Sequence, residues 1–342
     1  MEHTAVLPGA QGPRPPVRGG APKRRRRRRP GRVIGVVLLV LVLAFGALWL
    51  YLDSSLTRVP ALDDYEGRPA DTPGTTWLLV GSDSREGLSE EDREELATGG
   101  AAGRRTDTIM VLHIPDGSHP ATLISLPRDS YVPIPGHGRR KLNAAFALGG
   151  PKLLVQTVET ITGLRIDRYA EVGFGGFRDI VDAVGGVEMC IEEPMKDPKA
   201  GLDLEAGCQE LDGAQALGYV RTRASARADL DRVERQRQFL SALVDKAASP
   251  GTLINPFRSI PLLTSIPDAL TVGEDEHLHH LAGIGLAMSG GDLVTTTVPI
   301  SRTGTAPGAG SVVWWDRDKA SRLFQALADD QPVPEDVLSG PR

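Results

Sequence analysis

The fold of this 342-residue chain is decided by residues 77–85, WLLVGSDSR. The four apolar residues predict a short buried strand, because they form an apolar run bounded by turn residues. Asp83 and Arg85 follow directly, and side chains two positions apart in an extended segment point to the same side. We therefore expect both charges to face a ligand at the end of this strand.

Two further clusters lie at predicted strand ends. Arg105 and Asp107 stand at the start of the next strand, again two positions apart, and Arg128 stands just past the end of the third. Ligand crevices of α/β sheets form at strand ends, so the three clusters can converge on one site. For any single residue the alternative is a surface ion pair, such as Arg128 with Asp129, and taken singly that alternative is the commoner one.

A second group of charges lies later in the sequence, before and within the predicted helix 231–248. Arg221 and Arg223 are two positions apart, while Arg232 and Gln236 share a helical face through their i, i+4 spacing. The apolar stripe of the same helix consists of Val233, Leu240 and Val244. This stripe is centred about 80° around the helix from the pair, so we expect one side to be buried and the other offered to a ligand.

These residue types are suited to a metal-bound polyphosphate. The guanidinium fork of Arg matches phosphate oxygens, and Asp is a hard oxygen ligand for Mg²⁺. The sequence contains no Gly-x-Ser-x-Gly, HExxH or Walker A motif, which favours catalysis by charge stabilisation over a protein nucleophile. For a base that activates an acceptor hydroxyl, the candidates are Asp229 and Asp231.

The wider sequence alternates strand-like and helix-like segments. This predicts an α/β fold, a single α/β/α sandwich domain around a mixed central sheet. The predicted strands are 77–80, 108–114, 121–126, 169–172, 187–191 and 293–299. The predicted helices are 151–162, 177–184, 231–248, 277–288 and 318–328. Residues 89–103 are expected to form a loop over the site, and no element is expected after about residue 329.

The N-terminal segment predicts a membrane anchor. Residues 1–32 hold ten Lys or Arg and one acid, and residues 33–52 carry no charge. Twenty apolar residues can cross a bilayer core of about 30 Å as a helix. The positive-inside rule keeps the head in the cytoplasm and places the chain after Asp53 outside. A cleaved signal peptide is the alternative, but its apolar region would be shorter and would end in small residues.

The predicted order of segments follows from this anchor. It is a disordered basic cytoplasmic head (1–32), a transmembrane helix (33–52), a linker (53–75), an extracytoplasmic catalytic domain (76–330) and a tail (331–342). Beyond residue 32 there are 29 basic and 43 acidic residues, a net charge of −14, which disfavours a nucleic-acid partner.

The chain has two cysteines, Cys190 and Cys208, which are close enough in sequence to close one short loop. In an oxidising compartment a disulfide is the natural interpretation, and it would stabilise the fold by about 3 kcal/mol. The alternative is two unconnected small core residues. A metal pair is excluded because no His or further Cys clusters nearby.

The charged clusters stand in segments that resemble the LytR-CpsA-Psr (LCP) family of bacterial cell-envelope enzymes. Between about Trp77 and Ala247 these segments are GSDSR, RRTDTIM, ISLPRDSYV, KLNAAFALGG, LDGAQALGYVRTR and DLDRVERQRQ. The resemblance implies a phosphotransferase that moves a glycopolymer from a polyprenyl-pyrophosphate carrier onto peptidoglycan. It also implies Mg²⁺ as cofactor and a site at the outer face of the cytoplasmic membrane.

The resemblance also implies roles for individual residues. Asp83 and Asp107 match the family's metal-associated aspartates. The pyrophosphate contacts that we expect, Arg85 among them from its position beside Asp83, are Arg85, Arg105, Arg128, Arg221, Arg223 and Gln236. Arg232, with Asp229 or Asp231, resembles an acidic and basic pair at the start of a long helix, and with Arg128 these are the expected catalytic residues. The long insertion before Gly103 departs from compact members of the family.

Two other functions remain open on this sequence. One is a polyprenyl-pyrophosphate phosphatase, in which water replaces the glycan hydroxyl at the same site. The other is a non-enzymatic envelope regulator, which the acidic composition and the lack of a helix-turn-helix pattern argue against. Teichoic acid, capsular polysaccharide and arabinogalactan present the same pyrophosphate, so the motifs do not choose among them. The Arg-, Gly- and Ala-rich composition suggests an actinobacterial source.

Overall fold

The chain is described here by a computed structural model, which covers residues 30–83, 90–91, 96, 106–222, 229–289 and 293–338. Two compact units are present, Met1–Leu48 and Trp49–Arg342. Helix α1 (Pro30–Ser54) begins in the first unit and ends in the second. Its residues Ile34–Ser54 have a mean hydropathy of 2.6 and are long and apolar enough to cross a membrane. This span agrees with the predicted anchor.

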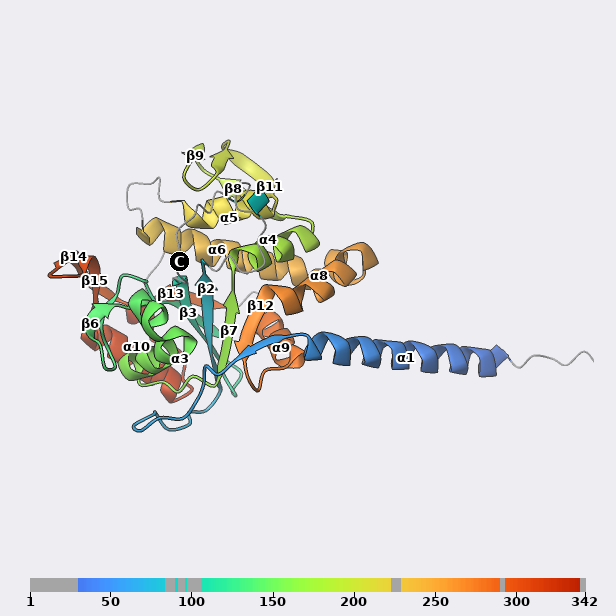
Figure 1. Ribbon diagram of the computed structural model, residues 1–342, viewed down its shortest axis with the longest axis horizontal. Helices are drawn as coiled ribbons and strands as arrows, with labels where there is room; N and C mark the ends of the chain where they lie inside the picture. Colours follow the sequence, from blue (N-terminus) through green and yellow to red (C-terminus); the bar gives the residue numbers. More distant parts are fainter. Residues whose placement is uncertain are drawn as a thin grey trace, which may run out of the picture. The chain divides into compact units, whose positions relative to one another are not determined.

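The second unit is built on a mixed seven-stranded sheet with the order β1-β12-β7-β2-β3-β4-β13 (Figure 1). The strands are, in that order, β1 (Thr57–Val59), β12 (Leu270–Gly273), β7 (Arg168–Val172), β2 (Thr75–Ser82), β3 (Thr106–Ile114), β4 (Thr122–Ser125) and β13 (Val294–Thr297). The pairs β1–β12, β7–β2 and β4–β13 are parallel, and the other three are antiparallel. The predicted mixed sheet is confirmed.

Side chains of the central strands alternate between two apolar cores, one on each face. Leu78 and Val80 of β2 belong to the first core, whereas Trp77 and Leu79 belong to the second. Strands that are apolar on both faces must be covered on both faces, which is the physical origin of the sandwich.

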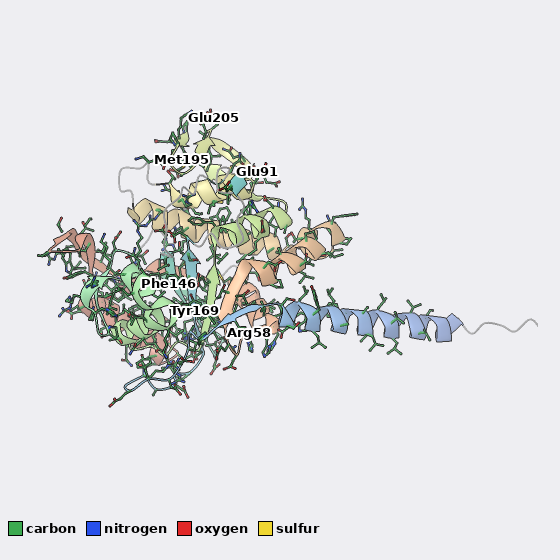
Figure 2. The ribbon with its side chains drawn as sticks, viewed as in Figure 1. Arg58, Glu91, Phe146, Tyr169, Met195 and Glu205 are labelled. Carbon is green, nitrogen blue, oxygen red and sulfur yellow. A yellow bond between two sulfur atoms is a disulfide. The ribbon has the colours of Figure 1, made fainter. Side chains whose placement is uncertain are left out.

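The first face is covered by helices α3 (Asn143–Thr162) and α10 (Arg317–Ala328) (Figure 1). Phe146 and Tyr169 lie among the side chains of this core (Figure 2). Helix α3 bends at Gly149 and Gly150, which have non-helical backbone angles directly before Pro151. This break explains why apolar periodicity predicts only the second part of the helix, from residue 151.

The second face is covered by α6 (Asp229–Ala248), α8 (Pro256–Ala269) and α9 (Leu278–Met288). A third core lies beyond the sheet, among α4 (Phe174–Ala183), α5 (Gly213–Arg221) and four short strands. These strands are β8 (Val187–Ile191), β9 (Met195–Asp197), β10 (Leu202–Leu204) and β11 (Gly207–Leu211). Helix α6 contributes Phe239 and Leu243 to the third core and Leu240 and Val244 to the second, so it is packed on two sides.

Strands β8 and β11 pair in antiparallel fashion and place Cys190 directly opposite Cys208. The two residues form the predicted disulfide. Both cysteines are exposed, so the alternative of small core residues is wrong.

Several elements carry too weak a pattern to be predicted from the sequence. They are β5 (Tyr131–Ile134), β6 (Gly138–Lys141), β14 (Ile300–Ala306), β15 (Gly310–Trp315), α7 (Pro250–Leu253) and the 3₁₀ helix η1 (Glu335–Val337), besides β1, β9, β10, β11, β12, α5 and α8. Helix η1 corrects the expectation that nothing regular follows residue 329.

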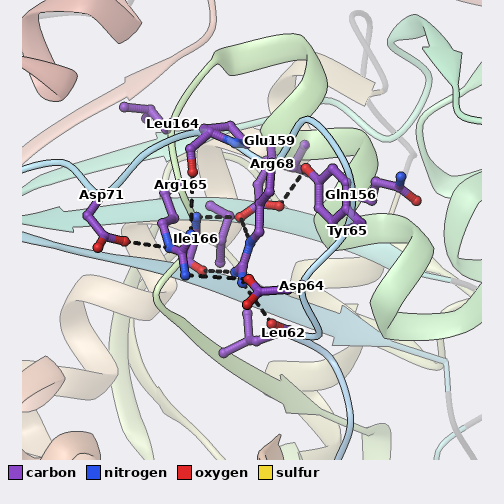
Figure 3. Close-up of polar contacts among 12 residues, drawn as sticks. Leu62, Asp64, Tyr65, Arg68, Asp71, Gln156, Glu159, Leu164, Arg165 and Ile166 are labelled. Carbon is purple, nitrogen blue, oxygen red and sulfur yellow. Dashed lines mark hydrogen bonds and ion pairs between the residues drawn. The ribbon is translucent and has the colours of Figure 1, made fainter.

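The segment between β1 and β2 is held against α3 by a buried ion pair (Figure 3). The Glu159 carboxylate, fully buried, accepts from Tyr65 Oη at 2.7 Å, Arg68 Nε at 3.0 Å and the Ile166 amide at 2.9 Å. Arg68 also donates to the carbonyls of Leu62 and Ile166. Burial and the hydrogen bond to Glu159 raise the pKa of Tyr65. The predicted linker is therefore an ordered part of this unit, since β1 also pairs with β12.

Candidate active site

Residues from three of the predicted clusters lie at the same end of the central strands. β2 ends at Ser82, antiparallel β3 begins at Thr106, and these two residues pair. β4 runs antiparallel to β3, so its C-terminal end and Arg128, which follows it, lie at the same end of the sheet. Asp83, Asp107 and Arg128 are thus brought together by strand direction alone, as the sequence predicts.

Asp107 occupies a β-bulge. Gly81 pairs with Thr108 and Ser82 pairs with Thr106, which leaves Asp107 as the extra residue of β3. Thr106 Oγ1 donates to the Gly81 carbonyl at 3.1 Å and holds the irregular pairing in place. A bulge changes the direction of one side chain in an otherwise regular ladder. It therefore explains how Asp107, in a strand lined by apolar neighbours, is aimed at Arg128.

Arg128 is held between two carboxylates. Its Nη1 donates to Asp107 Oδ1, and its Nε lies 3.4 Å from Asp129 Oδ2. Lys141 Nζ in turn lies 2.7 Å from Asp129 Oδ1, and the amide of Asn143 donates to the Arg128 carbonyl at 3.1 Å. The pair Arg128–Asp129 exists, but it belongs to a network in which the side chains of Arg128 and Asp107 are 15% and 31% exposed. A group brought to the site can reach both.

Arg221, the last residue of α5, lies at the same end of the sheet. Arg221 lies with its guanidinium carbon 4.7 Å from the ring centre of Phe174, the first residue of α4 after β7, and donates to the Leu96 carbonyl at 2.8 Å. β7 is the parallel neighbour of β2, so Phe174 and Asp83 follow adjacent strand ends. Cation–π contact and a carbonyl acceptor orient Arg221.

Arg232 and Gln236 are more buried than the helical stripe predicts, 3% and 8% exposed. Gln236 Nε2 donates to the Val220 carbonyl at 3.1 Å. The physical reason is that α6 is covered on two sides. At about 100° per residue, Arg232 and Gln236 lie on the same side as Phe239 and Leu243, which pack in the third core.

Some predicted residues lie outside the part of the chain that the structure describes. These are Arg85, Arg105 and Arg223, the side chains of Asp229 and Asp231, and most of the expected loop at 89–103. Their assigned roles stay predictions.

The donor set at the strand ends fits Mg²⁺. Asp83 and Asp107 supply hard carboxylate oxygens from adjacent strands, and Mg²⁺ in proteins is commonly held by one or two carboxylates together with substrate phosphates. No group of three or more His, Cys, Asp or Glu suited to a metal occurs among the described residues.

Two further cations of α6 were not predicted as site residues. Arg235 Nη2 donates to the Thr222 carbonyl at 2.7 Å, which fixes the end of α5. Arg237 is 8% exposed, and burial lowers its pKa. Its Nη1 has no hydrogen-bond partner within the described ranges. The only signal in the sequence is that Arg237 lies near the apolar stripe of Leu240 and Val244, where a charge is unexpected.

Comparison with known proteins agrees with this geometry. A family model described as "LytR_cpsA_psr family" matches residues 57–316. The chain is 56% identical over 323 residues to the "Probable cell wall biosynthesis protein LcpB" of Corynebacterium glutamicum, covering 92% of this chain and 77% of that protein. It is 35% identical over 215 residues to the "Polyisoprenyl-teichoic acid--peptidoglycan teichoic acid transferase TagT" of Bacillus subtilis, covering 61% and 62%.

Among solved structures, one described as "TagT bound to LI-WTA" superposes with a TM-score of 0.59 at 26% identity. The match covers 80% of this chain and 96% of that one. The similarity to a Corynebacterium protein agrees with the actinobacterial source suggested by composition.

Proposed function

This chain belongs to the LytR_cpsA_psr family, and from that premise we propose that it transfers a glycopolymer from a polyprenyl-pyrophosphate carrier onto peptidoglycan. The observation that carries the proposal is the contact of Arg128 with Asp107 at the shared end of strands β2, β3 and β4. A cation and a carboxylate at converging strand ends suit a phosphate and its metal.

In the proposed reaction the acceptor hydroxyl oxygen attacks the phosphorus that bears the glycopolymer. The new O–P bond forms as the bond to the second phosphate breaks, and polyprenyl phosphate leaves with the electron pair. Arg128 and Arg221 would neutralise negative charge on the two phosphates, and such charge stabilisation is the main task in phosphoryl transfer. The hydroxyl proton would go to Asp229 or Asp231.

Asp83 and Asp107 would hold Mg²⁺, which supplies positive charge against the phosphate oxygens when bound. Arg128 would then act beside the metal, since its guanidinium contacts one of the carboxylates. The anchor helix would place the reaction at the outer face of the cytoplasmic membrane, with the basic head inside.

The test is transfer by the full chain in nanodiscs, using a radiolabelled polyprenyl-pyrophosphate saccharide as donor and peptidoglycan oligomers as acceptor. We expect Mg²⁺-dependent label on the glycan, abolished by EDTA and reduced about 10²–10³-fold in Arg128→Ala, as for loss of one charge-stabilising donor. Arg322→Ala is the matched control, because Arg322 of α10 forms an exposed pair with Asp336 of η1. Release of saccharide phosphate without glycan product would instead identify a phosphatase.

A further inference from the structure

A cavity of about 480 Å³ opens beside the β5–β6 hairpin, and its lining residues do not include Asp83, Asp107, Arg128 or Arg221. Its walls come from this hairpin, the C-terminal end of α3, the end of β15 and one face of α10. The volume lies within the range of about 300–1,000 Å³ that is typical of small-ligand pockets. The resemblance assigns no role to these elements.

Aromatic rings form one wall of the cavity. Tyr131 and Trp314 meet edge to face, with ring centres 6.1 Å apart and planes at 70°. Trp315 is fixed behind them, because its Nε1 donates to Ser130 Oγ at 2.8 Å and its ring packs 5.9 Å from that of the buried Phe324. Half-buried aromatic rings in fixed orientations are suited to the apolar C–H faces of sugar rings, which pack against the electron-rich ring face.

The polar lining of the cavity is cationic. Arg139 and Arg317 line it, and no Asp or Glu is among its lining residues. Arg139 lies over the Tyr131 ring at 5.2 Å and donates to the Tyr131 carbonyl at 2.9 Å. Within the described chain, neither arginine forms an ion pair with a carboxylate. In a chain with a net charge of −5, this local excess of positive charge favours an anionic ligand.

The cavity shares a rigid frame with the candidate active site. Tyr131 follows Arg128 by three residues, so their Cα atoms are at most about 11 Å apart. The intervening Asp129 and Ser130 are fixed by backbone bonds, from the Val313 amide to the Asp129 carbonyl and from the Leu142 amide to the Ser130 carbonyl, both 2.9 Å. Arg128 and the cavity residue Tyr131 therefore belong to one short segment with a fixed backbone.

We propose that this cavity binds a short anionic saccharide, with sugar rings against Tyr131 and Trp314 and a phosphate or carboxylate facing Arg139 and Arg317. Binding itself is independent of transfer, but its place in the reaction rests on the proposed function. Two sources carry this chemistry, namely the glycopolymer of the donor, through phosphate or carboxylate groups, and the acceptor peptidoglycan, through its muramic acid units.

The test is isothermal titration of the full chain in nanodiscs with three probes. They are phosphate-bearing glycopolymer fragments, soluble peptidoglycan glycan fragments, and a neutral N-acetylglucosamine tetramer. We expect one of the two anionic probes to bind at least tenfold more tightly than the neutral tetramer, and its identity names the source. Trp314→Ala and Arg317→Ala should each weaken that binding at least tenfold, whereas Arg322→Ala, on the same helix, should not.

The outcomes separate this inference from the proposed function. Arg128→Ala should reduce transfer about 10²–10³-fold, and in that background Trp314→Ala and Arg317→Ala should still weaken binding of the anionic probe. Transfer without binding of any probe would contradict the proposed saccharide binding but not the proposed function. Binding without transfer would contradict the proposed function but not the saccharide binding. Binding that is indifferent to charge, or unchanged in both Trp314→Ala and Arg317→Ala, would also overturn the inference. Thermal melting checks that each variant is folded, and Arg317 is exposed, so its loss leaves the core intact.

Discussion

The two ends of the central sheet use the same residue types in different ways. At one end, Glu159 and Arg68 are sealed between α3 and the segment before β2, with side chains 0% and 7% exposed, and their contacts include backbone groups. At the other end, Asp107 and Arg128 pair through side chains that remain open to solvent. An ion pair bound to its own backbone stabilises the fold, whereas one that faces solvent at strand ends can exchange its partner for a ligand.

The largest effect should come from the end of the sheet at which Glu159 and Arg68 are buried, here called the closed end. Glu159→Ala leaves the buried Arg68 with only the exposed Asp64 as a carboxylate partner, and loss of one partner of a buried pair costs about 3–5 kcal/mol. The measurement is the free energy of unfolding in urea. Asp63→Ala is the matched control, because Asp63 pairs with Lys152 of the same helix in an exposed position, where about 0–1 kcal/mol is expected. Equal losses in the two variants would remove the distinction between the ends.

Asp107→Asn should have the opposite profile. Transfer should fall about 10²–10³-fold, equivalent to about 3–4 kcal/mol, because Asp107, the partner of Arg128 and a proposed ligand of Mg²⁺, loses its charge. The free energy of unfolding should change by no more than about 1 kcal/mol, as for an exposed pair. A loss of stability as large as that of Glu159→Ala would show that this end, too, is structural.

The disulfide offers a comparison with a region that depends on neither ion pair. The double variant Cys190→Ser, Cys208→Ser should lower the stability of the third core by about 3 kcal/mol, as expected for a loop of this size. Denaturant unfolding with and without a reducing agent measures this effect. Wild type should respond to the reducing agent and the double variant should not, and a variant as stable as oxidised wild type would contradict the prediction.

The smallest effect is a pH dependence at the closed end of the sheet. Burial, with the Arg168 guanidinium 2.6 Å away, lowers the pKa of His280 to about 4. The unfolded chain binds the proton at about pH 6.5, so the contribution of His280 is complete above that pH and is lost as the pH falls toward 4. Burial raises the pKa of neighbouring Glu276, which gives a slope of opposite sign.

Comparison with His280→Asn isolates the imidazole. Between pH 7 and pH 5, wild type should lose more stability than the variant in urea titrations. Equal losses would show that His280 does not titrate in this window. His280 is half-buried against Arg168 and Glu276, whereas the adjacent His279 is exposed.

Most of the sheet can be predicted because its strands are apolar on both faces, and the site clusters follow from strand ends. What could not be predicted depends on contacts between distant segments. Helix α6 has one visible apolar stripe, yet Phe239 and Leu243 bury a second side, and this is why Gln236 is covered. β12 has only four residues and takes its place by pairing with β7 and β1. Glu159 has no local signal, since its partners lie about ninety residues earlier.

The pairing of Thr57 with Thr271 has a consequence for how the protein is made. The first strand to emerge after the anchor helix has its only sheet neighbour, β12, near the other end of the chain. While the polypeptide is synthesised from its N-terminal end, β1 must wait, with an unpaired edge, until β12 has been made. Pairing between segments so distant in sequence is slow. Completion of this sheet is therefore a late event of biosynthesis, and assistance from chaperones would act on that interval.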